Sequence, residues 1–308
     1  MLARRAELLR TIRHFFDSRD FLEVDTPILS ADTVVDRHLE PFTVDVSGST
    51  FFLQTSPEFA MKRLLAAGMK AIYQITHVFR QAERGQRHNP EFMMLEWYRV
   101  GDTYQSGMDL LAELAEATLD RGPAERLTYA EAFERHVSIN PHTADADCLL
   151  RAIDQQKIDA AGFDPADRDG LLDLLLTHRI EPHLGVSRPT ILYDYPASQS
   201  ALAKIRDDGP GNPPVAERFE LYVDSLELAN GYHELTDPAE LRRRNAAVND
   251  QRAADGHARL PEESRLLAAM DAGLPESVGV ALGFDRLLMA ITGATQIDHV
   301  LPFPIDRA

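Results

Sequence analysis

The sequence predicts an α+β fold in which an antiparallel β-sheet is flanked by helices. Two observations lead to this prediction. Short apolar and β-branched runs come in adjacent pairs with helical patterns between the pairs, whereas a parallel sheet needs a crossover after each strand. No glycine- and serine-rich linker and no break in composition divides the 308 residues. We therefore expect a single domain over residues 1–308.

The amino-terminal part of the chain begins with an amphipathic helix. Leu8, Ile12 and Phe16 recur at four-residue spacing, which places them on one face of a helix over residues 3–19. Phe21–Pro27 is a short strand that the proline ends. The other elements expected in this part are strands at 41–46, 50–54, 71–79 and 91–99 and a helix at 57–67.

Helical patterns fill much of residues 104–184, and the stretch 128–184 is a possible helical insertion. Paired strand patterns return after it. The elements expected there are strands at 189–195, 217–223, 226–235 and 277–283 and helices at 238–255, 262–271 and 284–292.

Composition limits the classes of partner and the compartment. The chain has 49 acidic and 32 basic residues and a formal net charge of -17, which disfavours extensive contact with tRNA. The single cysteine, Cys148, excludes an intramolecular disulfide framework and a cysteine-based zinc site. We find no signal peptide and no apolar run of about 18–20 residues. We therefore expect a soluble, cytoplasmic protein with no membrane partner.

The first segment with chemical potential runs from Tyr73 to Tyr98, as two strands joined by a polar loop. Arg80 ends the first strand, and Arg87 and His88 lie in the loop. An arginine fork there can hold a phosphate and stabilise negative charge that develops on phosphorus. Phe92 offers a flat apolar face for a purine. Arg80 taken alone fits an ordinary surface charge better.

The second segment is a hairpin that turns at Asp224-Ser225. A two-residue turn sets Tyr222 opposite Glu227, and Glu220 shares the face of Tyr222, so the two glutamates become diagonal neighbours. Two adjacent carboxylates are costly unless a cation joins them, and Mg²⁺ on a nucleotide phosphate is the natural cation. Solvated acids on an exposed strand face are an equally weighted alternative.

The end of this hairpin leaves its register open. Simple alternation puts Asn230, Tyr232 and Glu234 on the opposite face from Glu227. They reach the same pocket only if a β-bulge near Asn230-Gly231 resets the register.

The third segment runs from Gly279 to Met289. A strand breaks at Gly283 and a helix begins, which places Arg286 in the first helical turn. The free N–H groups and the positive end of that helix favour phosphate, and Arg286 adds to them. A single junction of this kind is weak evidence by itself.

The chain resembles the class II aminoacyl-tRNA synthetases in three signature motifs. Phe21–Pro27 resembles motif 1, the dimer-interface motif, Phe79–Glu96 resembles motif 2, and Gly279–Arg286 resembles motif 3. Three motifs in the correct order over nearly the whole chain make a chance match improbable. The resemblance implies the class II catalytic fold, a homodimer formed through motif 1, and the use of ATP with Mg²⁺.

Two further stretches, Arg87–Phe92 and Glu227–Glu234, resemble the lysyl branch of that class. A lysyl-tRNA synthetase carries an anticodon-binding domain of about a hundred residues before motif 1, and with motif 1 at residue 21 we expect none here. The best resemblance is therefore to the elongation factor P lysyltransferases, the elongation factor P–(R)-β-lysine ligases. The stretches that resemble this family are Thr55–Gly68, Met94–Arg99, Tyr195–Ser200 and Asp306–Ala308.

That resemblance implies activation of (R)-β-lysine or lysine by ATP as an aminoacyl adenylate, followed by transfer to a lysine ε-amino group of elongation factor P. Arg80 and Arg286 would be catalytic, and Glu220 and Glu227 would hold Mg²⁺. The residues that would bind ATP are Arg80, Glu83, His88, Asn89, Phe92, Glu220 and Arg286. The residues that would bind the amino acid are Ser56, Glu58, Tyr98, Asn230, Glu234 and Ala281.

Within this set the resemblance assigns more detailed roles. Arg80 would contact the α-phosphate and the substrate carboxylate, and Phe92 with Arg286 would sandwich the adenine. Glu234 and Tyr98 would meet the terminal ammonium group. A carboxylate on the pocket floor selects lysine, because a buried charge without a partner rejects a neutral side chain.

The sequence departs from the synthetase pattern at two positions. Motif 2 usually has an acid two residues after its arginine, and Ala82 stands there with Glu83 after it. Whether Glu83 takes over the adenine contact stays open. Synthetases usually have glycine where Ala281 stands, and the modifying family resembles this chain in having alanine. The resemblance implies that Ala281 favours (R)-β-lysine over α-lysine.

Three other functions remain compatible with this core. One is a truncated synthetase that acylates tRNA or a tRNA-like RNA, and another is a ligase that joins the amino acid to a small amine. The third is an inactive regulatory subunit. A binding module needs no phosphate arginines and magnesium carboxylates together, so the presence of Arg80, Arg286, Glu220 and Glu227 argues against the third.

Overall fold

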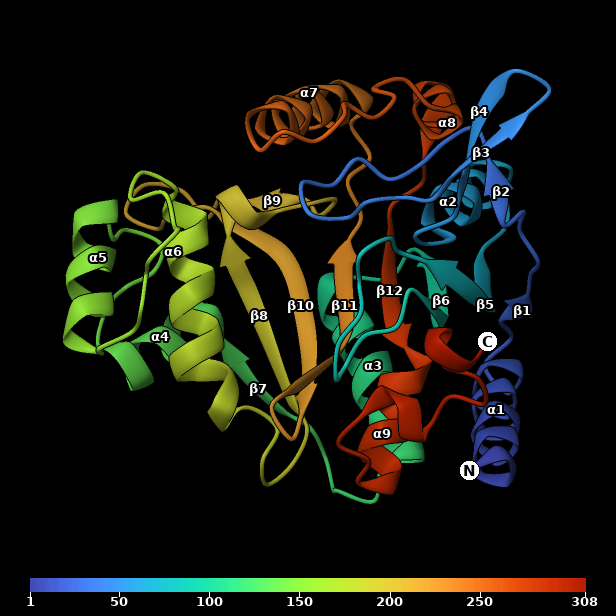
Figure 1. The fold of residues 1–308 in the computed structure, drawn as a ribbon, viewed down its shortest axis with the longest axis horizontal. Coiled ribbons are helices and arrows are strands. Elements are labelled where there is room, and N and C mark those ends of the chain that lie inside the picture. Colours follow the sequence, from blue (N-terminus) through green and yellow to red (C-terminus); the bar gives the residue numbers. More distant parts are fainter. The chain divides into compact units, whose positions relative to one another are not determined.

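Two groups of β-strands dominate the structure, a computed structural model that describes residues 1–308 (Figure 1). They belong to two units of the chain. The terminal unit comprises Met1–Thr103 and Glu234–Ala308, and the middle unit comprises Tyr104–His233. Each unit combines strands with helices, as the predicted α+β class requires.

The main sheet strands of the terminal unit follow the order β1-β5-β6-β12. Strand β6 pairs antiparallel with β5 and with β12, so that Glu96 lies between Gln74 and Ala281. Strand β1 pairs parallel with β5. A smaller antiparallel sheet has the order β2-β4-β3. The bounds are β1 Leu22–Glu23, β2 Leu29–Ser30, β3 Thr43–Val46, β4 Ser49–Leu53, β5 Ala71–Phe79, β6 Glu91–Val100 and β12 Ser277–Gly283.

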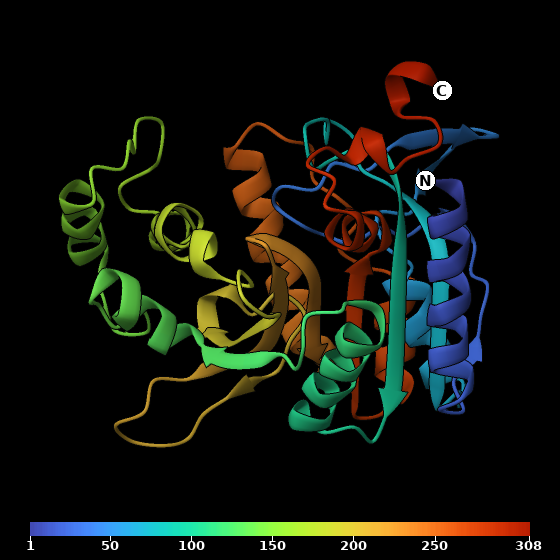
Figure 2. The same ribbon diagram turned by 90° about the horizontal axis from the view of Figure 1, so that it is seen from below.

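Helix α1, Leu2–Asp17, packs its apolar face against these strands. The ring of Phe16 stacks on Tyr73 of β5 at 4.8 Å between centroids and lies 5.3 Å from Trp97 of β6. Figure 2 shows α1 running alongside both strands. The four-residue apolar spacing in the sequence is thereby explained. The other helices of this unit are α2 Glu58–Ala66, α7 Pro238–Ala254, α8 Arg265–Gly273 and α9 Phe284–Thr292, with short turns at Ile297–His299 and Ile305–Arg307.

The strands of the middle unit follow the order β11-β10-β8-β7, and β9 pairs with β10. The pairs β10–β11 and β10–β8 are antiparallel, whereas β7 and β8 are parallel. Their bounds are β7 Glu125–Thr128, β8 Thr190–Pro196, β9 Ile205–Arg206, β10 Val215–Val223 and β11 Leu226–His233. The helices are α3 Tyr104–Thr118, α4 Tyr129–Val137, α5 Ala146–Gln155 and α6 Arg168–Leu175, followed by turns at Leu176–Ile180, Glu181–His183 and Ala197–Gln199.

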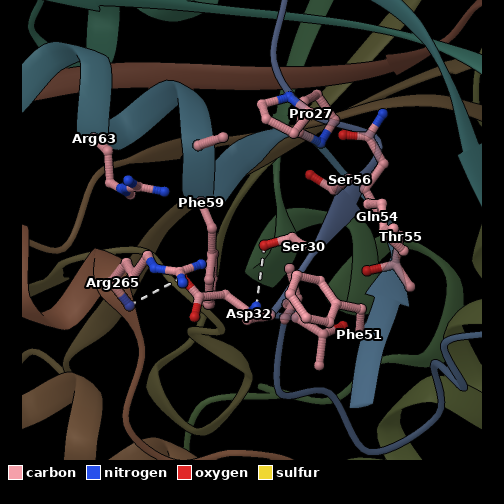
Figure 3. A pocket seen from close by; sticks show the side chains of 16 residues that line it. Pro27, Ser30, Asp32, Phe51, Gln54, Thr55, Ser56, Phe59, Arg63 and Arg265 are labelled. Carbon is pink, nitrogen blue, oxygen red and sulfur yellow. Dashed lines mark hydrogen bonds between the residues drawn. The ribbon is translucent and has the colours of Figure 1, made fainter. Parts of the chain in front are cut away.

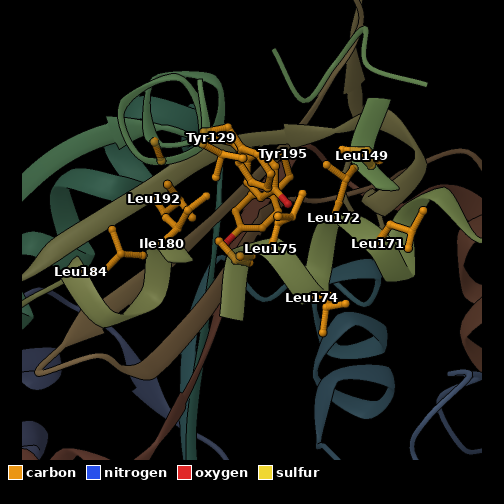
Figure 4. Packing of buried hydrophobic residues seen from close by; sticks show 14 of the residues in the cluster. Tyr129, Leu149, Leu171, Leu172, Leu174, Leu175, Ile180, Leu184, Leu192 and Tyr195 are labelled. Atoms are coloured by element: carbon orange, nitrogen blue, oxygen red, sulfur yellow. The ribbon is translucent and has the colours of Figure 1, made fainter. Parts of the chain in front are cut away.

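A compact apolar cluster joins α4, α5 and α6 to the strands of the middle unit (Figure 4). Leucines of α6, including Leu171 and Leu175, meet Leu149 of α5, and the rings of Tyr129 and Tyr195 lie 4.8 Å apart. Thr128 caps α4 through a capping box with Glu131. The helical stretch 128–184 therefore packs around an apolar core in which leucine and tyrosine side chains predominate.

Most of the predicted elements are confirmed with shifts of a few residues at their ends. The prediction missed the short strands β2, β7 and β9. The sheet pairings are mainly antiparallel, as predicted, and β1 and β7 each add one parallel pairing. None of the helices combines the length and apolarity that a crossing of the bilayer would require.

Candidate active site

The antiparallel ladder of β6 and β12 sets the floor of the candidate amino-acid pocket. Glu96 and Tyr98 alternate onto one face of β6, and their partners across the ladder are Ala281 and Gly279. Ala281 is therefore a direct cross-strand neighbour of Glu96, with side chains that share a face. This register explains how a residue at position 281 can shape the space in front of the Glu96 carboxylate.

Gly279 is required by the close approach of two pocket residues. A Cβ atom at this position would lie 2.2 Å from Oε1 of Glu234 and 2.2 Å from Cε1 of Tyr98. Neither group can give way, because Glu234 is 1% exposed and Tyr98 is 3% exposed. The absence of a side chain at Gly279 thus makes room for the two groups predicted to meet the terminal ammonium.

Three carboxylates and one ammonium group form the buried centre of the pocket, which we call the carboxylate cluster: Glu58, Glu96, Glu234 and Lys62. Lys62 Nζ lies 2.5 Å from Oε1 of Glu58, one turn away on α2, and 2.5 Å from Oε2 of Glu234. Ser56 Oγ donates to Oε1 of Glu96 at 2.5 Å, and Tyr98 Oη donates to Oε2 at 2.7 Å. With every group ionised the cluster carries a net charge of about -2.

Burial makes this negative charge costly, and the pKa values respond. Burial, reinforced by Glu58, raises the pKa of Glu96 to about 7, although Ser56 and Tyr98 oppose the rise. Burial also raises the pKa of Glu234 to about 8, with Lys62 opposing and Glu58 reinforcing the rise. The pKa of Lys62 is raised against the effect of its own burial, because Glu234 and Glu58 attract the ammonium. The cluster therefore holds protons near neutral pH unless further cations arrive.

One oxygen in the cluster lacks a hydrogen-bond donor. Glu234 Oε2 is buried and close to Lys62 Nζ, but the contact does not have hydrogen-bond geometry. A buried carboxylate oxygen without a donor is costly in a folded protein. A ligand ammonium group has N–H donors that could make this hydrogen bond.

A pocket beside α2 reaches the carboxylate cluster at Ser56 (Figure 3). Arg63 and Arg265 lie on one side of it, and Thr55 and Ser56 lie on the other. Asp32 closes it by accepting the backbone N–H of Arg265 at 2.9 Å. Because Ser56 also donates to Glu96, this pocket adjoins the cluster within the terminal unit.

Three of the residues predicted to bind ATP, Arg80, Glu83 and Phe92, lie together. The guanidinium of Arg80 lies over the Phe92 ring, 5.2 Å from its centroid, and its Nε donates to the carbonyl of Thr55 at 3.3 Å. Glu83 Oε1 lies 3.6 Å from Nη1 of Arg80. The backbone at Ala82 has φ 65°, a left-handed conformation that turns the chain between Arg80 and Glu83.

His88 and Arg286 meet across 198 residues of sequence, with His88 Nε2 2.6 Å from Nη2 of Arg286. Burial and the charge of Arg286 lower the pKa of His88, so its Nε2 stays unprotonated and accepts from the arginine. Arg286 lies in the first turn of α9, as predicted. The pair combines a permanent cation with a helix N-terminus, which suits phosphate.

Asn89 has a role in the structure that the sequence did not suggest. It is 2% exposed, its Nδ2 donates to the carbonyl of Glu91 at 2.6 Å, and its Oδ1 accepts from the N–H of Ile305 at 3.0 Å. Arg84 adds contacts to Asp298 at 2.9 Å and Asp306 at 2.5 Å. The loop between β5 and β6 is therefore tied to the carboxy-terminal segment.

Sequence reasoning missed three residues that build the site: Glu96, Lys62 and Asp285. Asp285 is 1% exposed, pairs with Arg5 of α1 and accepts the N–H of Met93 at 2.7 Å. It fixes α9, and with it Arg286, against β6. The signal available for all three was a charged residue inside an otherwise apolar element.

The hairpin of β10 and β11 carries the remaining predicted residues, Glu220, Glu227 and Asn230, in the middle unit. The Asp224-Ser225 turn is confirmed, with φ 51° and 61°, and Tyr222 faces Glu227 as predicted. Glu220 faces Asn230, because Leu221 already pairs with Ala229. Leu228 is the extra residue of a bulge, which brings Glu227 and Asn230 onto one face.

The bulge that the sequence left open thus exists, at Leu228 and not at Asn230-Gly231. Gly231 lies in regular register opposite Phe219, and a Cβ atom there would be 2.4 Å from the Phe219 ring. The glycine serves this close packing and not the bulge. The side chain of Asn230 donates to Tyr232 Oη at 2.9 Å, and its buried Oδ1 has no hydrogen-bond donor.

The donor set around Glu220 fits a magnesium ion that is shared with a nucleotide. Arg218 Nη2 donates to Oε1 at 2.5 Å, and the hydroxyls of Tyr195 and Tyr222 donate to Oε2 at 2.6 Å each. Two carboxylate oxygens have about four acceptor sites, so three bonds leave room for a metal. No group of three or more acidic, histidine or cysteine side chains could hold a metal by itself. Mg²⁺ bound by one or two carboxylates plus phosphates needs no such group.

The predicted site residues therefore divide between the two units. The terminal unit holds Ser56, Glu58, Arg80, Glu83, His88, Asn89, Phe92, Tyr98, Glu234, Ala281 and Arg286, and the middle unit holds Glu220, Glu227 and Asn230. Within the terminal unit they include members of the carboxylate cluster, the contact of Arg80 with Phe92 and the contact of Arg286 with His88.

Comparisons with known proteins agree with this arrangement. Residues 1–307 match the family of tRNA synthetases class II (D, K and N). A Vibrio cholerae protein named elongation factor P–(R)-beta-lysine ligase is 47% identical over 100% of this chain and 96% of its own length. Proteins of that name from Edwardsiella ictaluri and Klebsiella pneumoniae are each 45% identical over 100% of this chain and 95% of their own lengths.

A family match over almost every residue and relatives at this level of identity are decisive for membership. The motif order, the arginines and the buried acids found above are what such a family would place here. The chain therefore belongs to the class II tRNA synthetase family (D, K and N), in the branch of its elongation factor P–(R)-beta-lysine ligase relatives.

Proposed function

We propose that this protein is a ligase that activates (R)-β-lysine or lysine with ATP and transfers the acyl group to a lysine of elongation factor P. The observation that carries the proposal is the carboxylate cluster. It contains three buried carboxylates and a single ammonium group, that of Lys62, so two negative charges have no partner within the cluster. A free diamino acid brings two ammonium groups, which match this deficit, whereas a neutral or acidic amino acid does not.

In the first step the substrate carboxylate attacks the α-phosphorus of ATP, and pyrophosphate leaves. Arg80 holds the α-phosphate and the attacking carboxylate, and its fixed charge offsets the charge that accumulates on phosphorus. Phe92 and Arg286 hold the adenine, and His88, kept neutral, accepts from Arg286 near the triphosphate. Glu83 acts on this side by pairing with Arg80. Asn89 acts by holding the loop between β5 and β6 in place.

Residues of the terminal unit are proposed to hold most of the amino acid, and Asn230 is proposed to bind its head. Glu234 and Tyr98 receive the terminal ammonium, and Ser56 and Glu58 receive the head of the amino acid. Ala281, the cross-strand neighbour of Glu96, narrows the space there and favours the β-amino isomer. Glu96 joins these residues as the deepest carboxylate.

Glu220 and Glu227 are proposed to hold Mg²⁺ bound to ATP, and when bound the ion neutralises phosphate charge and orients the leaving group. Arg218 and the two tyrosines orient the Glu220 carboxylate for this purpose.

In the second step the neutral ε-amino group of the acceptor lysine attacks the mixed anhydride, and AMP leaves. An amine nucleophile and a reactive anhydride held in place need no dedicated side-chain base. The excess of negative charge on the chain is compatible with a protein acceptor and disfavours extended tRNA contact.

We further propose that the two units work as one catalytic domain and that the protein is a cytoplasmic homodimer. The family match runs through both units without interruption. Three apolar residues of the motif 1 stretch and the strand after it are exposed: Leu22 at 56%, Ile28 at 42% and Leu29 at 38%. A second copy covering them is the occupant that the motif 1 resemblance implies.

The deciding experiment supplies ATP and labelled (R)-β-lysine or α-lysine to elongation factor P and to lysine tRNA in parallel. Label on the protein, with (R)-β-lysine preferred, is the expected result. Label on the tRNA alone would mean a minimal synthetase and would refute the proposal. Pyrophosphate exchange without either product would leave a ligase for a small amine, which a screen of amine acceptors would detect.

A further inference from the structure

Lys62 is a buried cation at the centre of the amino-acid pocket to which no role has been assigned above. It projects from α2, is 2% exposed, and bridges Glu58 to Glu234 at 2.5 Å from each. These two carboxylates are the ones proposed to receive the two ends of the substrate. Lys62 therefore contacts both ends of the pocket without occupying the reacting centre, which lies with Arg80 and the phosphates.

The surroundings of Lys62 define the charge of the whole pocket. The titratable groups that face it are Glu58 on α2, Glu96 and Tyr98 on β6, and Glu234 next to β12. Strand β12 itself contributes only Gly279 and Ala281 to this face. Three carboxylates against one ammonium leave two negative charges, and without Lys62 they would leave three.

We propose that Lys62 is a positioning and specificity-determining residue that fixes the charge deficit of the pocket at two, so that the pocket accepts a substrate with two ammonium groups. This inference rests on the proposed function, because it takes a diamino acid as the substrate. It adds to that function a residue that does not touch the reacting atoms. It also states which substrate charge the pocket accepts.

The physical reason is the high cost of uncompensated buried charge. In the free protein the excess is relieved by protons, because burial raises the pKa of Glu96 to about 7 and that of Glu234 to about 8. Two substrate ammonium groups replace those protons and leave all three carboxylates ionised. If Lys62 were neutral, one carboxylate would stay uncompensated even with substrate bound, and a proton would have to remain.

The main test compares Lys62→Met with the wild-type protein in pyrophosphate exchange from pH 6 to pH 9. We expect KM for the diamino acid at pH 7 to rise at least tenfold, while kcat changes by less than about threefold. The acid limb of kcat/KM should move up by at least one pH unit, since a tenfold change in binding equals one unit of pKa. The matched control is Lys70→Met, the same substitution at an exposed lysine of the same unit, which should match the wild type.

A charge-balanced double variant separates charge from packing. Lys62→Met combined with Glu58→Gln removes one cation and one anion and restores the deficit of two. Its acid limb should return to within about half a pH unit of the wild type, even though the lost Glu58 contact keeps KM raised. A purely structural role of Lys62 predicts the opposite, because two buried substitutions would then do more damage than one.

Inhibitor binding gives a readout that does not depend on turnover. 1,5-Diaminopentane carries two ammonium groups at about the spacing of those of lysine, and pentylamine carries one. The wild type should bind the diamine at least tenfold more tightly than the monoamine. The Lys62→Met protein should bind the diamine at least tenfold more weakly than the wild type near pH 7, because a further proton must then remain in the pocket.

The outcomes are distinguishable. Absence of lysine-dependent exchange in the wild type would overturn the proposed function itself. Normal exchange in the wild type, with an unmoved acid limb in Lys62→Met or no recovery in the double variant, would overturn only the role of Lys62. Should the Lys62 variants fail to fold, calorimetry on the wild type in buffers of different ionisation enthalpy decides. Release of one to two protons on binding of the diamine near pH 7 supports the charge count, and release of none overturns it.

Discussion

At the scale of single residues, the carboxylate cluster shows what a sequence motif conveys and what it leaves out. Glu58, Tyr98 and Glu234 were found through a resemblance to a lysyl pattern, and the structure gathers them with Ser56 around Glu96. From the sequence, Glu96 was identified only as the last residue of motif 2. Its significance depends on complete burial and on its cross-strand neighbours, which no local pattern encodes.

Glu96→Gln tests the value of the buried carboxylate. Glutamine keeps the shape and accepts from Ser56 or Tyr98, but it removes one negative charge that faces the substrate. A charged hydrogen bond contributes about 1.5–3 kcal/mol, so KM for the amino acid should rise about 10- to 150-fold in pyrophosphate exchange. Glu91→Gln, an exposed glutamate of the same strand, is the control and should behave as the wild type. An unchanged KM in Glu96→Gln would remove Glu96 from the pocket.

Ala281→Gly tests the isomer preference. Removing the methyl group beside Glu96 enlarges the head of the pocket, so the ratio of kcat/KM values should shift towards α-lysine by about tenfold, the scale of a single methylene in a pocket. The measurement is exchange with each isomer under identical conditions. A ratio that stays the same would refute the assignment of selectivity to this position.

At the scale of secondary-structure elements, the hairpin of β10 and β11 marks how far local sequence rules extend. The turn was predictable because two-residue turns fix the register of their flanking strands. The bulge was left open near Asn230-Gly231, and the structure has it at Leu228. The structure needs Gly231 for the ring of Phe219, a contact between strands that the single-strand pattern does not contain.

Missed elements follow the same logic. Strand β7 is only four residues long and stands in a stretch whose pattern is otherwise helical. It exists because β8 supplies a parallel partner more than sixty residues later. Long helices such as α1 were predictable because their apolar spacing is contained within the helix itself.

Ser225→Gly tests the backbone of the turn. Asp224 and Ser225 both have positive φ, and glycine adopts this conformation without steric cost at the second position. Relief of about 1–2 kcal/mol of left-handed strain exceeds the entropy cost of about 0.5–1 kcal/mol that glycine adds. The substitution should therefore stabilise the protein by up to about 1 kcal/mol, which raises Tm by roughly 1–3 °C in a chain of this size. Ser225→Val, which disfavours positive φ, should lower Tm in the same calorimetric scan. A lower Tm for Ser225→Gly would contradict the turn geometry.

At the scale of the whole molecule, the three-motif order was enough to predict the family, and the α+β fold followed from the pairing of strands. The parallel edge strands and the contacts of the carboxy-terminal segment were not predictable, because both join residues far apart in the sequence. Asn89 is the instructive example, since it was assigned to ATP and its amide is engaged by Glu91 and Ile305.

The raised pKa values predict how stability depends on pH. Glu96 and Glu234 have folded pKa values of about 7 and 8 against an ordinary value of 4.5, so the folded state holds protons that the unfolded state releases. Stability of the ligand-free protein should therefore fall from about pH 4.5 to pH 8 and then level off. Lys62 does not titrate in this window, because its pKa is raised from 10.5.

Thermal melts from pH 5 to pH 9, with and without lysine, measure this effect. The increase in Tm that lysine produces should grow as pH rises towards 8, since the ligand supplies the missing positive charge. The double variant Glu96→Gln with Glu234→Gln should lose the corresponding part of the pH dependence. A wild-type profile identical to that of the double variant would show that these carboxyls titrate normally.

The proposed homodimer is testable through its exposed apolar residues. Introducing Leu22→Asp together with Leu29→Asp places charges in the face that a second copy would cover, so the protein should sediment as a monomer. Val186→Asp, at an apolar residue of the middle unit that is 58% exposed, should leave the dimer intact. Sedimentation velocity over a range of concentrations gives the answer, and a wild type that is monomeric throughout would end the proposal.

The contacts between the motif 2 loop and the last residues of the chain make the loop sensitive to proteolytic trimming. Arg84 and Asp306 are 222 residues apart in sequence, and Ile305 holds Asn89. An exopeptidase that trims only the final four residues would remove the contacts of Asp306 and Ile305 with the loop, while the contact of Arg84 with Asp298 and every strand would stay in place. Such a trimmed protein would pass as intact by size and by circular dichroism, yet the loop that is proposed to bind the nucleotide would be held by fewer contacts.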